Sequence, residues 1–171
     1  MSEKDSNTLP WTVMSHSVTE TRKIADILTR LILPSAVVLL SGDLGSGKTT
    51  LIQAIAASLG YRGAVKSPTF DLVHVYECDA VRIYHVDLYR VQSPDELSVL
   101  DLPYAGEDRT LVLAEWGDML APWYPDHFHL TCESCGSRCR RFRLDAQGEA
   151  YYRRWEKWLG SSETIEKEIG H

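Results

Sequence analysis

At 171 residues the chain is long enough for one domain with a sizeable core and short for two. Its 18 Lys and Arg against 24 Asp and Glu give a net charge of −6, which argues against a protein that coats nucleic acid by charge alone. The apolar runs fall far below the roughly 20 residues that cross a bilayer, and Met1–Asp5 has no apolar signal segment. We therefore expect one cytoplasmic domain over 1–171, with no membrane partner, reduced cysteines and flexible ends at 1–10 and 160–171.

Strand and helix signals mix along the whole chain. Ser17 and Glu20 fit a capping box at the start of a helix that Pro34 ends. The apolar run 36–40 lacks alternation, as in a strand buried on both faces, and a helical stripe over 51–59 follows it. Later patterns predict strands at 70–76 and 81–89 joined by a turn, a short helix opening at Ser93, a strand at 111–114, a hairpin of 127–132 with 141–145, and a last helix over 151–159. This mixture predicts an α/β fold with a mixed sheet.

Residues 42–49 read Gly-Asp-Leu-Gly-Ser-Gly-Lys-Thr and match the phosphate-binding pattern G-x-x-x-x-G-K-[ST] at every fixed position. Glycines let successive backbone N–H groups turn inward around phosphate oxygens, and the following helix adds its positive dipole end. We expect Lys48 to reach the β- and γ-phosphates, Thr49 to place its hydroxyl on Mg²⁺, and Thr50 to contact a further phosphate oxygen. The loop residues expected around the nucleotide are Asp43, Leu44, Gly45, Ser46, Gly47, Lys48, Thr49 and Thr50.

The position of this loop between a buried strand and a helix distinguishes it from a chance glycine-rich turn. It predicts a three-layer P-loop NTPase fold, in which helices flank a central mixed β-sheet. The guanine-reading motif Asn-Lys-x-Asp is absent, because the only asparagine, Asn7, lies upstream of the loop. ATP is therefore the expected nucleotide, bound together with Mg²⁺.

Two acids stand at the ends of predicted strands. Glu115 directly follows the apolar strand 111–114, and Asp87 ends the strand predicted to begin at 81. A phosphate-binding loop needs acids to hold Mg²⁺ and to orient the attacking group. We expect Asp87, Glu115 and Lys48 to serve catalysis, and Thr49, Glu115 and Asp87 to bind the metal. Spacing leaves the division of roles between the two acids open, and a solvated surface carboxylate is the alternative for each.

Several segments together resemble a known family. In chain order they are 42–50, Ser67-Pro68-Thr69-Phe70, His85–Arg90 and Glu115-Trp116. They are similar to the bacterial tRNA threonylcarbamoyladenosine biosynthesis ATPase family TsaE, over about residues 15–125. The resemblance places Thr69 in a loop that senses the nucleotide state, and Thr21, in the segment 17–21, near the adenine. Gly117 stands where the family commonly has proline, so a different exit from the strand that ends at Glu115 is expected, and Val86 replaces the usual phenylalanine with a small loss of volume.

The resemblance also implies what the protein does. It implies an ATPase, slow alone and stimulated by partners, that assists the TsaB–TsaD complex. That complex forms threonylcarbamoyladenosine in tRNAs that read A-starting codons, and hydrolysis would reset it. The chain would meet tRNA only through the complex. A small-molecule kinase, with the arginine-rich stretch 138–143 as a lid, and a nucleotide-gated binding module without significant turnover are the alternatives.

The segment from 127 to 154 gathers cysteine, histidine and arginine. His129, Cys132, Cys135 and Cys139 can be written as a zinc set, but the distant second ligand pair of structural zinc sites is missing from the sequence. We therefore expect free thiols at a hairpin turn rather than zinc. Six of the twelve arginines lie between Arg138 and Arg154. We interpret this stretch as a solvated basic face, with docking of an acidic partner or of tRNA as the alternative. For His85 and Trp116 we favour interior packing.

Overall fold

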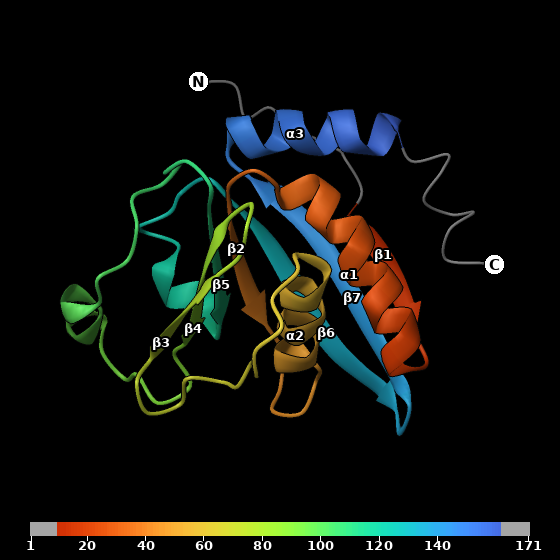
Figure 1. The fold of residues 1–171 in the computed structure, drawn as a ribbon, viewed down its shortest axis with the longest axis horizontal. Coiled ribbons are helices and arrows are strands. Elements are labelled where there is room, and N and C mark those ends of the chain that lie inside the picture. Colours follow the sequence, from red (N-terminus) through yellow and green to blue (C-terminus); the bar gives the residue numbers. More distant parts are fainter. Residues whose placement is uncertain (1–9, 162–171) are drawn as a thin grey trace.

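The computed structural model describes residues 10–161 and arranges them around one seven-stranded sheet (Figure 1). The strands are β1 (Trp11–Ser15), β2 (Ala36–Ser41), β3 (Val73–Glu77), β4 (Arg82–Asp87), β5 (Thr110–Glu115), β6 (His127–Gly136) and β7 (Cys139–Gln147). The helices are α1 (Val18–Ile32), α2 (Lys48–Ser58) and α3 (Glu149–Gly160), with the short 3₁₀ helices η1 (Pro94–Val99) and η2 (Gly117–Leu120). Of the flexible ends that we expect at 1–10 and 160–171, residues 1–9 and 162–171 lie outside the described residues, whereas Gly160 is the last residue of α3.

The sheet is mixed, as the sequence predicts. Its order is β1-β7-β6-β2-β5-β4-β3, and the four neighbouring strands β6, β2, β5 and β4 run parallel. β3 runs antiparallel to β4, β7 to β6, and β1 to β7. Parallel neighbours end at the same edge of a sheet, where ligand sites of open α/β sheets lie. At this edge Asp87 at the end of β4 pairs in register with Glu115 at the end of β5.

Helices flank both faces of the sheet. Val38 and Leu40 of β2 belong to the core that α1 and α2 cover, whereas Val37 and Leu39 belong to a second core with η1 and η2. This alternation explains why 36–40 is apolar at every position, and it confirms the strand buried on both faces. α3 packs against β7 and α1 (Figure 1). Between residues 10 and 161, no helix has both the length and the apolar character that a membrane span requires.

A side-chain cap fixes where α1 begins. The Ser17 hydroxyl accepts a hydrogen bond from the Glu20 backbone N–H at 3.1 Å, which confirms the first half of the expected capping box. The Glu20 carboxylate accepts instead from the N–H of His16, at 2.7 Å, one residue earlier than expected. The start of η1 carries the complete box between Ser93 and Glu96. The cap of α1 holds the β1–α1 connection in place beside the edge where β4 and β5 end.

Several element boundaries differ from the predicted ones. β3 begins at Val73 rather than 70, because the preceding residues form a turn in which the Leu72 N–H bonds the Pro68 carbonyl at 2.8 Å. β6 and β7 are longer than predicted and continue to the pair Gly136–Cys139, across a bulge after Ser134. β1 was not predicted, since its five residues gain their strand conformation by pairing with β7 from the opposite end of the chain.

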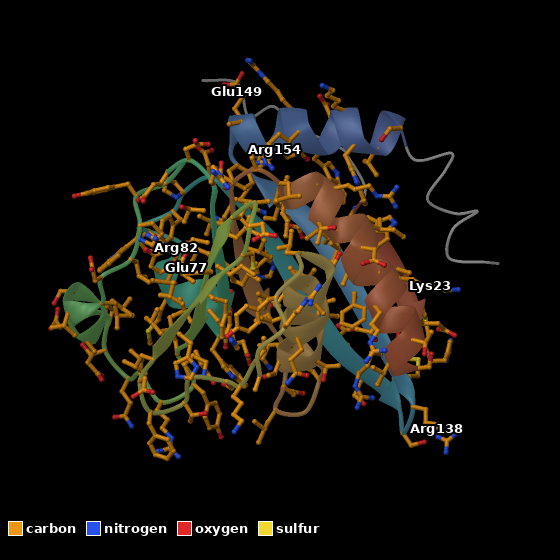
Figure 2. The ribbon with its side chains drawn as sticks, viewed as in Figure 1. Lys23, Glu77, Arg82, Arg138, Glu149 and Arg154 are labelled. Carbon is orange, nitrogen blue, oxygen red and sulfur yellow. A yellow bond between two sulfur atoms is a disulfide. The ribbon has the colours of Figure 1, made fainter. Side chains whose placement is uncertain are left out.

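The arginines between 138 and 154 have different environments (Figure 2). Arg154 of α3 donates hydrogen bonds to the carbonyls of Ser35 and Leu31, and burial lowers its pKa. Arg153 and Arg141 make surface ion pairs with Glu149 and Glu133, of a kind worth at most about 1 kcal/mol. Arg138 lies at the end of the β6–β7 hairpin (Figure 2). The stretch is therefore not one uniform solvated face: it combines a structural arginine, surface ion pairs and arginines at the hairpin end.

Candidate functional site

A cavity of about 710 Å³ opens at the edge where the parallel strands end. It is walled by the start of α1, the glycine-rich loop (residues 42–49), the segment 67–69 and the turn between β6 and β7. The predicted site residues that line it are Thr21, Leu44, Gly45, Gly47, Lys48, Thr49, Thr50, Thr69, Asp87 and Glu115. Asp43 and Ser46 do not line it, because Asp43 is exposed on the outside of the loop and Ser46 is buried beneath it.

The glycine-rich loop has a backbone that only glycine accommodates at two positions. Gly42 has a φ of +135°, and a Cβ there would lie 2.1 Å from the Cys132 carbonyl oxygen of β6. Gly47 has a φ of +107° at the N-cap of α2, so the helix starts directly at the cavity. The N-terminus of α2 therefore points free N–H groups and a positive dipole end into the cavity, as an anion requires.

The Lys48 ammonium is folded back on its own loop. Lys48 is only 4% exposed, and its Nζ donates to the carbonyls of Gly42 at 2.6 Å and Asp43 at 2.9 Å. The same Nζ lies 4.3 Å from the centre of the Trp116 ring, a favourable cation–π arrangement. Trp116 thus lines the cavity beside the lysine, in addition to the packing that we favoured for it. To meet a phosphate, the ammonium must exchange these carbonyls for phosphate oxygens.

Glu115 stands at the centre of a buried hydrogen-bond chain. The Thr49 hydroxyl contacts both carboxylate oxygens of Glu115, at 2.8 and 3.0 Å. His85 lies 2.8 Å from the same carboxylate through Nε2, and its Nδ1 lies 3.2 Å from the Tyr76 hydroxyl. Tyr76 in turn donates to the Lys66 carbonyl, and burial raises the pKa of its phenol, which stays protonated. These connected hydrogen bonds fix the carboxylate of Glu115 beside the first turn of α2.

His85 is buried with both ring nitrogens occupied, as expected for an interior histidine. The sequence reasoning missed that one of its partners is the acid of the site. Residues two apart on a strand share a face, and His85 is two residues before Asp87. That spacing was the available signal.

Asp87 has different partners from Glu115. One of its carboxylate oxygens accepts from the Ser67 hydroxyl, and the other accepts from the Tyr89 backbone N–H at 2.9 Å. Ser67 and Thr69 belong to one segment, and both line the cavity. Asp87 is therefore connected to the segment 67–69, whereas Glu115 is connected to the glycine-rich loop through Thr49.

The oxygen donors at this edge suit a magnesium ion carried by a nucleotide. Mg²⁺ is usually held by one or two carboxylates together with substrate phosphates and water, rather than by a cage of protein ligands. Among residues 10–161 no group of three His, Cys, Asp or Glu side chains could hold a metal ion by itself. The hydroxyl of Thr49 and the carboxylate of Glu115, with the Asp87 carboxylate on the neighbouring strand, would offer the incomplete, all-oxygen set that such an ion completes with phosphates and water.

Thr21 lines the cavity from α1, but its hydroxyl is already engaged. It lies 2.8 Å from the Ser15 hydroxyl and donates to the Ser17 carbonyl at 3.2 Å. Its hydrogen bonds hold the β1–α1 connection. Val18 and Phe142 add apolar surface to the same wall, which suits the flat face of a base. Neither residue was among the predicted site residues.

The cysteines correct the expectation of free thiols at the hairpin turn. Cys135 and Cys139 form a disulfide, with their Cα atoms 5.0 Å apart. The bulge after Ser134 turns Cys135 to the same side as Cys139, which the sequence pattern did not reveal. Cys132 is a free thiol in the core, and burial raises its pKa to about 12. Cys78 is also free.

The class of protein follows from the fold and from the loop. The structure superimposes on the crystal structure of Bacillus subtilis YdiB with a TM-score of 0.70 and 23% identity, covering 92% of this chain and 99% of that one. This likeness concerns the fold. With a glycine-rich loop between β2 and α2, the chain has a P-loop NTPase-like fold, as the sequence predicts.

The sequence comparisons narrow this class to a family. The profile of the family described as threonylcarbamoyl adenosine biosynthesis protein TsaE matches residues 15–142, and the chain belongs to this family. Three proteins named tRNA threonylcarbamoyladenosine biosynthesis protein TsaE are similar to it. That of Haemophilus influenzae is 41% identical over 57% of this chain and 62% of its own length, and that of Rickettsia conorii is 39% identical over 61% and 60%. That of Bacillus subtilis is 32% identical over 77% and 83%. The chain thus spans less than two thirds of the length of the first two relatives.

Proposed function

We propose that this chain is an ATPase that serves threonylcarbamoyladenosine formation in tRNA. It binds ATP with Mg²⁺ in the cavity and assists the TsaB–TsaD complex, and hydrolysis resets that complex. Membership of the TsaE family supports the link to this tRNA modification. The observation that carries the nucleotide part is the contact of Thr49 with Glu115 directly beside the glycine-rich loop, since it joins a hydroxyl and a carboxylate at a helix N-terminus.

Different residues of the cavity bind the phosphates and the Mg²⁺ ion. The backbone N–H groups of the glycine-rich loop and the start of α2 hold the phosphates, and Lys48 leaves the carbonyls of Gly42 and Asp43 to contact them. Thr49 and Glu115 hold Mg²⁺, which neutralises charge on the phosphate oxygens when bound. His85 keeps Glu115 in place from the core side.

Asp87 serves the attacking water. It lies beside Glu115 in the sheet but makes no hydrogen bond with Thr49, and its contact with Ser67 ties it to the segment that carries Thr69. We assign to Asp87 the orientation of water, and to Thr69 the contact that is lost when the terminal phosphate leaves. The segment 67–69 then changes position with the nucleotide state, in the manner of other nucleotide-controlled loops.

Slow turnover of the chain alone is consistent with the arrangement of Lys48. Its ammonium is satisfied by its own loop, and two carbonyl contacts have to be given up before it stabilises transferring charge. Binding to TsaB–TsaD would favour the rearranged loop. A small-molecule kinase is the second candidate, because Arg138 and Arg140 of the β6–β7 turn line the cavity where a basic lid would close.

A reconstitution separates these functions. Purified chain is mixed with TsaB, TsaD and tRNA, and ATP hydrolysis and capture of the chain on immobilised TsaB–TsaD are measured with and without ATP. The proposal predicts nucleotide-dependent capture and hydrolysis that the partners stimulate. Transfer of phosphate from ATP to a metabolite would establish the kinase instead. Binding of ATP without hydrolysis in the full mixture would leave a nucleotide-gated binding module.

A further inference from the structure

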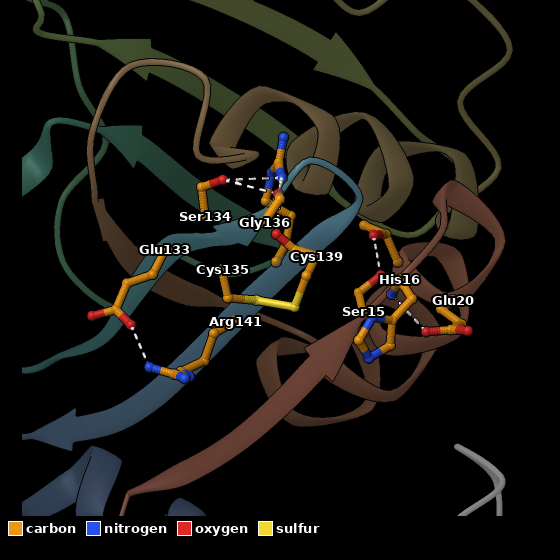
Figure 3. The surroundings of a disulfide bond; sticks show 11 residues. Ser15, His16, Glu20, Glu133, Ser134, Cys135, Gly136, Cys139 and Arg141 are labelled. Atoms are coloured by element: carbon orange, nitrogen blue, oxygen red, sulfur yellow. Dashed lines mark hydrogen bonds and ion pairs between the residues drawn. A yellow bond between two sulfur atoms is a disulfide. The ribbon is translucent and has the colours of Figure 1, made fainter.

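The turn between β6 and β7 is closed by the Cys135–Cys139 disulfide, whose surroundings Figure 3 shows. The strands pair up to Ser134–Arg140 and again at Gly136–Cys139, and Cys135 is the unpaired residue of the bulge between them. Neighbouring residues of a strand point to opposite faces. The disulfide therefore lies on one face of the turn, and the paired side chains of Ser134 and Arg140 lie on the other.

Arg140 connects this turn to the glycine-rich loop. Its aliphatic carbons lie 3.6 Å from the place that a Cβ on Gly47 would take, at the N-cap of α2. Its guanidinium is held by the turn, since Nη1 donates to the Cys139 carbonyl at 2.8 Å and to the Gly136 carbonyl at 3.2 Å. Nη1 also lies 3.3 Å from the Ser134 hydroxyl. Of these acceptors, the Gly136 carbonyl lies inside the loop that the disulfide closes, and the Cys139 carbonyl belongs to one of the two bonded cysteines.

We propose that the Cys135–Cys139 disulfide is a positioning device for the nucleotide cavity. By closing the turn it holds the Arg140 guanidinium beside Gly47, where the arginine adds a positive charge for the phosphates of the bound nucleotide. The proposal rests on the proposed function, because it concerns the same cavity. It makes nucleotide affinity depend on the oxidation state of a disulfide in the cavity wall.

The chemistry of opening the bond is thiol–disulfide exchange. A dithiol reductant gives two electrons and two protons to the two sulfurs, so the S–S bond becomes two thiols and the reductant becomes a cyclic disulfide. Cys135 is exposed and Cys139 is partly exposed, so a reductant reaches the bond. The turn then loses the cross-link that orders the Gly136 and Cys139 carbonyls, and Arg140 loses its fixed acceptors.

The chain offers matched controls. Arg141 is the next residue on β7, faces the other side and pairs with Glu133 on the surface, without lining the cavity. The free cysteines Cys78 and Cys132 stay in a variant in which Cys135 and Cys139 are both serine. That variant thus separates the effect of the bond from any other effect of a reductant.

The test is the affinity of the purified chain for Mg²⁺-ATP and for adenosine, measured by calorimetry before and after treatment with dithiothreitol. We expect reduction to weaken ATP binding about tenfold, the size of one lost charge-assisted contact, and to leave adenosine binding unchanged. The Cys135→Ser/Cys139→Ser variant should have the ATP affinity of the reduced protein, and dithiothreitol should not change that affinity. Arg140→Gln should lose the same factor, Arg140→Lys should recover part of it, and Arg141→Gln should bind like the wild type.

Equal ATP affinity of the oxidised and reduced protein, or tight binding by the serine variant or by Arg140→Gln, would overturn the positioning role and leave the proposed function intact. No ATP binding by the oxidised wild type would overturn the proposed function, and this proposal with it. Hydrogen exchange of the 134–140 amides without nucleotide is a second measurement. Faster exchange after reduction supports the ordering of the turn by the disulfide, and unchanged exchange contradicts it. Circular dichroism of each variant shows that the fold is kept.

Discussion

The hydroxyl of Thr49 donates to the carboxylate of Glu115, 2.8 Å away, and so joins the first turn of α2 to the end of β5. The two residues are 66 positions apart in the sequence. Each is a group that Mg²⁺ binds readily, and each satisfies the other in this structure. The two ligands that we assign to the metal are thus already held together by the fold, which lowers the ordering needed when a nucleotide binds.

Glu115→Gln tests the metal assignment. Glutamine keeps the size of the side chain and one acceptor oxygen but removes the charge that would hold Mg²⁺. We expect hydrolysis of ATP in the presence of TsaB, TsaD and tRNA to fall at least about 100-fold, the order seen when one charge-stabilising group is lost. ATP affinity should change much less. Phosphate release and calorimetric binding measure the two effects, with Glu156→Gln on the exposed side of α3 as control. Full turnover in Glu115→Gln would remove this residue from the mechanism.

His85→Ala tests the buried chain behind Glu115. The substitution leaves the Glu115 carboxylate and the Tyr76 hydroxyl without a shared partner in the core. We expect the free energy of unfolding in urea to fall by about 2–3 kcal/mol, from the two lost buried hydrogen bonds and the cavity. Tyr76→Phe should cost about 1 kcal/mol.

A double-mutant cycle of His85 and Tyr76 measures how strongly the two side chains stabilise each other. Because the two side chains are in contact, the double variant should lose less stability than the sum of the single ones. Strict additivity would mean that His85 and Tyr76 act independently. The hydrogen-bond chain that positions Glu115 would then end at His85 and would not include Tyr76.

Asp87→Asn tests the separate role of the second acid. The amide oxygen of asparagine can still accept from the Tyr89 N–H while its NH₂ group donates to the Ser67 hydroxyl oxygen, so the segment 67–69 should keep its position. Without the carboxylate charge the attacking water loses its orienting group, and we expect turnover to fall about 100-fold while ATP affinity stays within a few-fold. Ser67→Ala should give a smaller loss of turnover. If Asp87→Asn weakened ATP binding as strongly as turnover, Asp87 would be a metal ligand rather than a water-orienting residue.

Sequence patterns predicted those elements and residues whose structure depends on neighbours in the sequence. The glycine-rich loop, the strand over 36–40 and the acids Asp87 and Glu115 all follow from residues near one another in sequence. The expected difference from the family in the exit after Trp116 stays a prediction; in this structure Trp116 has a φ of +56°, and a Cβ on Gly117 would lie 3.1 Å from the Leu39 side chain.

What the sequence did not predict depends on pairing between distant segments. β1 exists because β7 pairs with it, and the disulfide exists because a bulge shifts the register of β6 against β7. The contact of His85 with Glu115 requires β4 and β5 to be neighbours, with His85 in register with Leu113. Composition and periodicity carry no information on such registers, so these features emerge only from the assembled sheet.

His127 gives the fold a pH dependence. Burial lowers the pKa of its imidazole below the ordinary 6.5, and nearby His129 lowers it further, while Nδ1 lies 2.7 Å from the Tyr124 carbonyl. The unfolded chain therefore binds more protons than the folded one between the two pKa values. Stability from neutral His127 is complete above pH 6.5 and is lost as the pH falls through the folded pKa.

The measurement is the free energy of unfolding in urea between pH 8 and pH 5. We expect His127→Gln to show a flatter dependence below pH 6.5 than the wild type, whereas His16→Gln, an exposed change, should follow the wild type. Parallel curves for the wild type and His127→Gln would show that His127 does not titrate differently on folding.

The central claim, that the glycine-rich loop binds ATP through Lys48, is tested most directly by calorimetric titration of Mg²⁺-ATP into the wild type and Lys48→Ala. Lys48 is the buried cation of the cavity, whereas Lys23 on the exposed side of α1 provides a control of equal charge change in Lys23→Ala. The account predicts one ATP site in the wild type and in Lys23→Ala, and loss of measurable binding in Lys48→Ala with the fold retained by circular dichroism. Equal ATP affinity in Lys48→Ala and the wild type would contradict it.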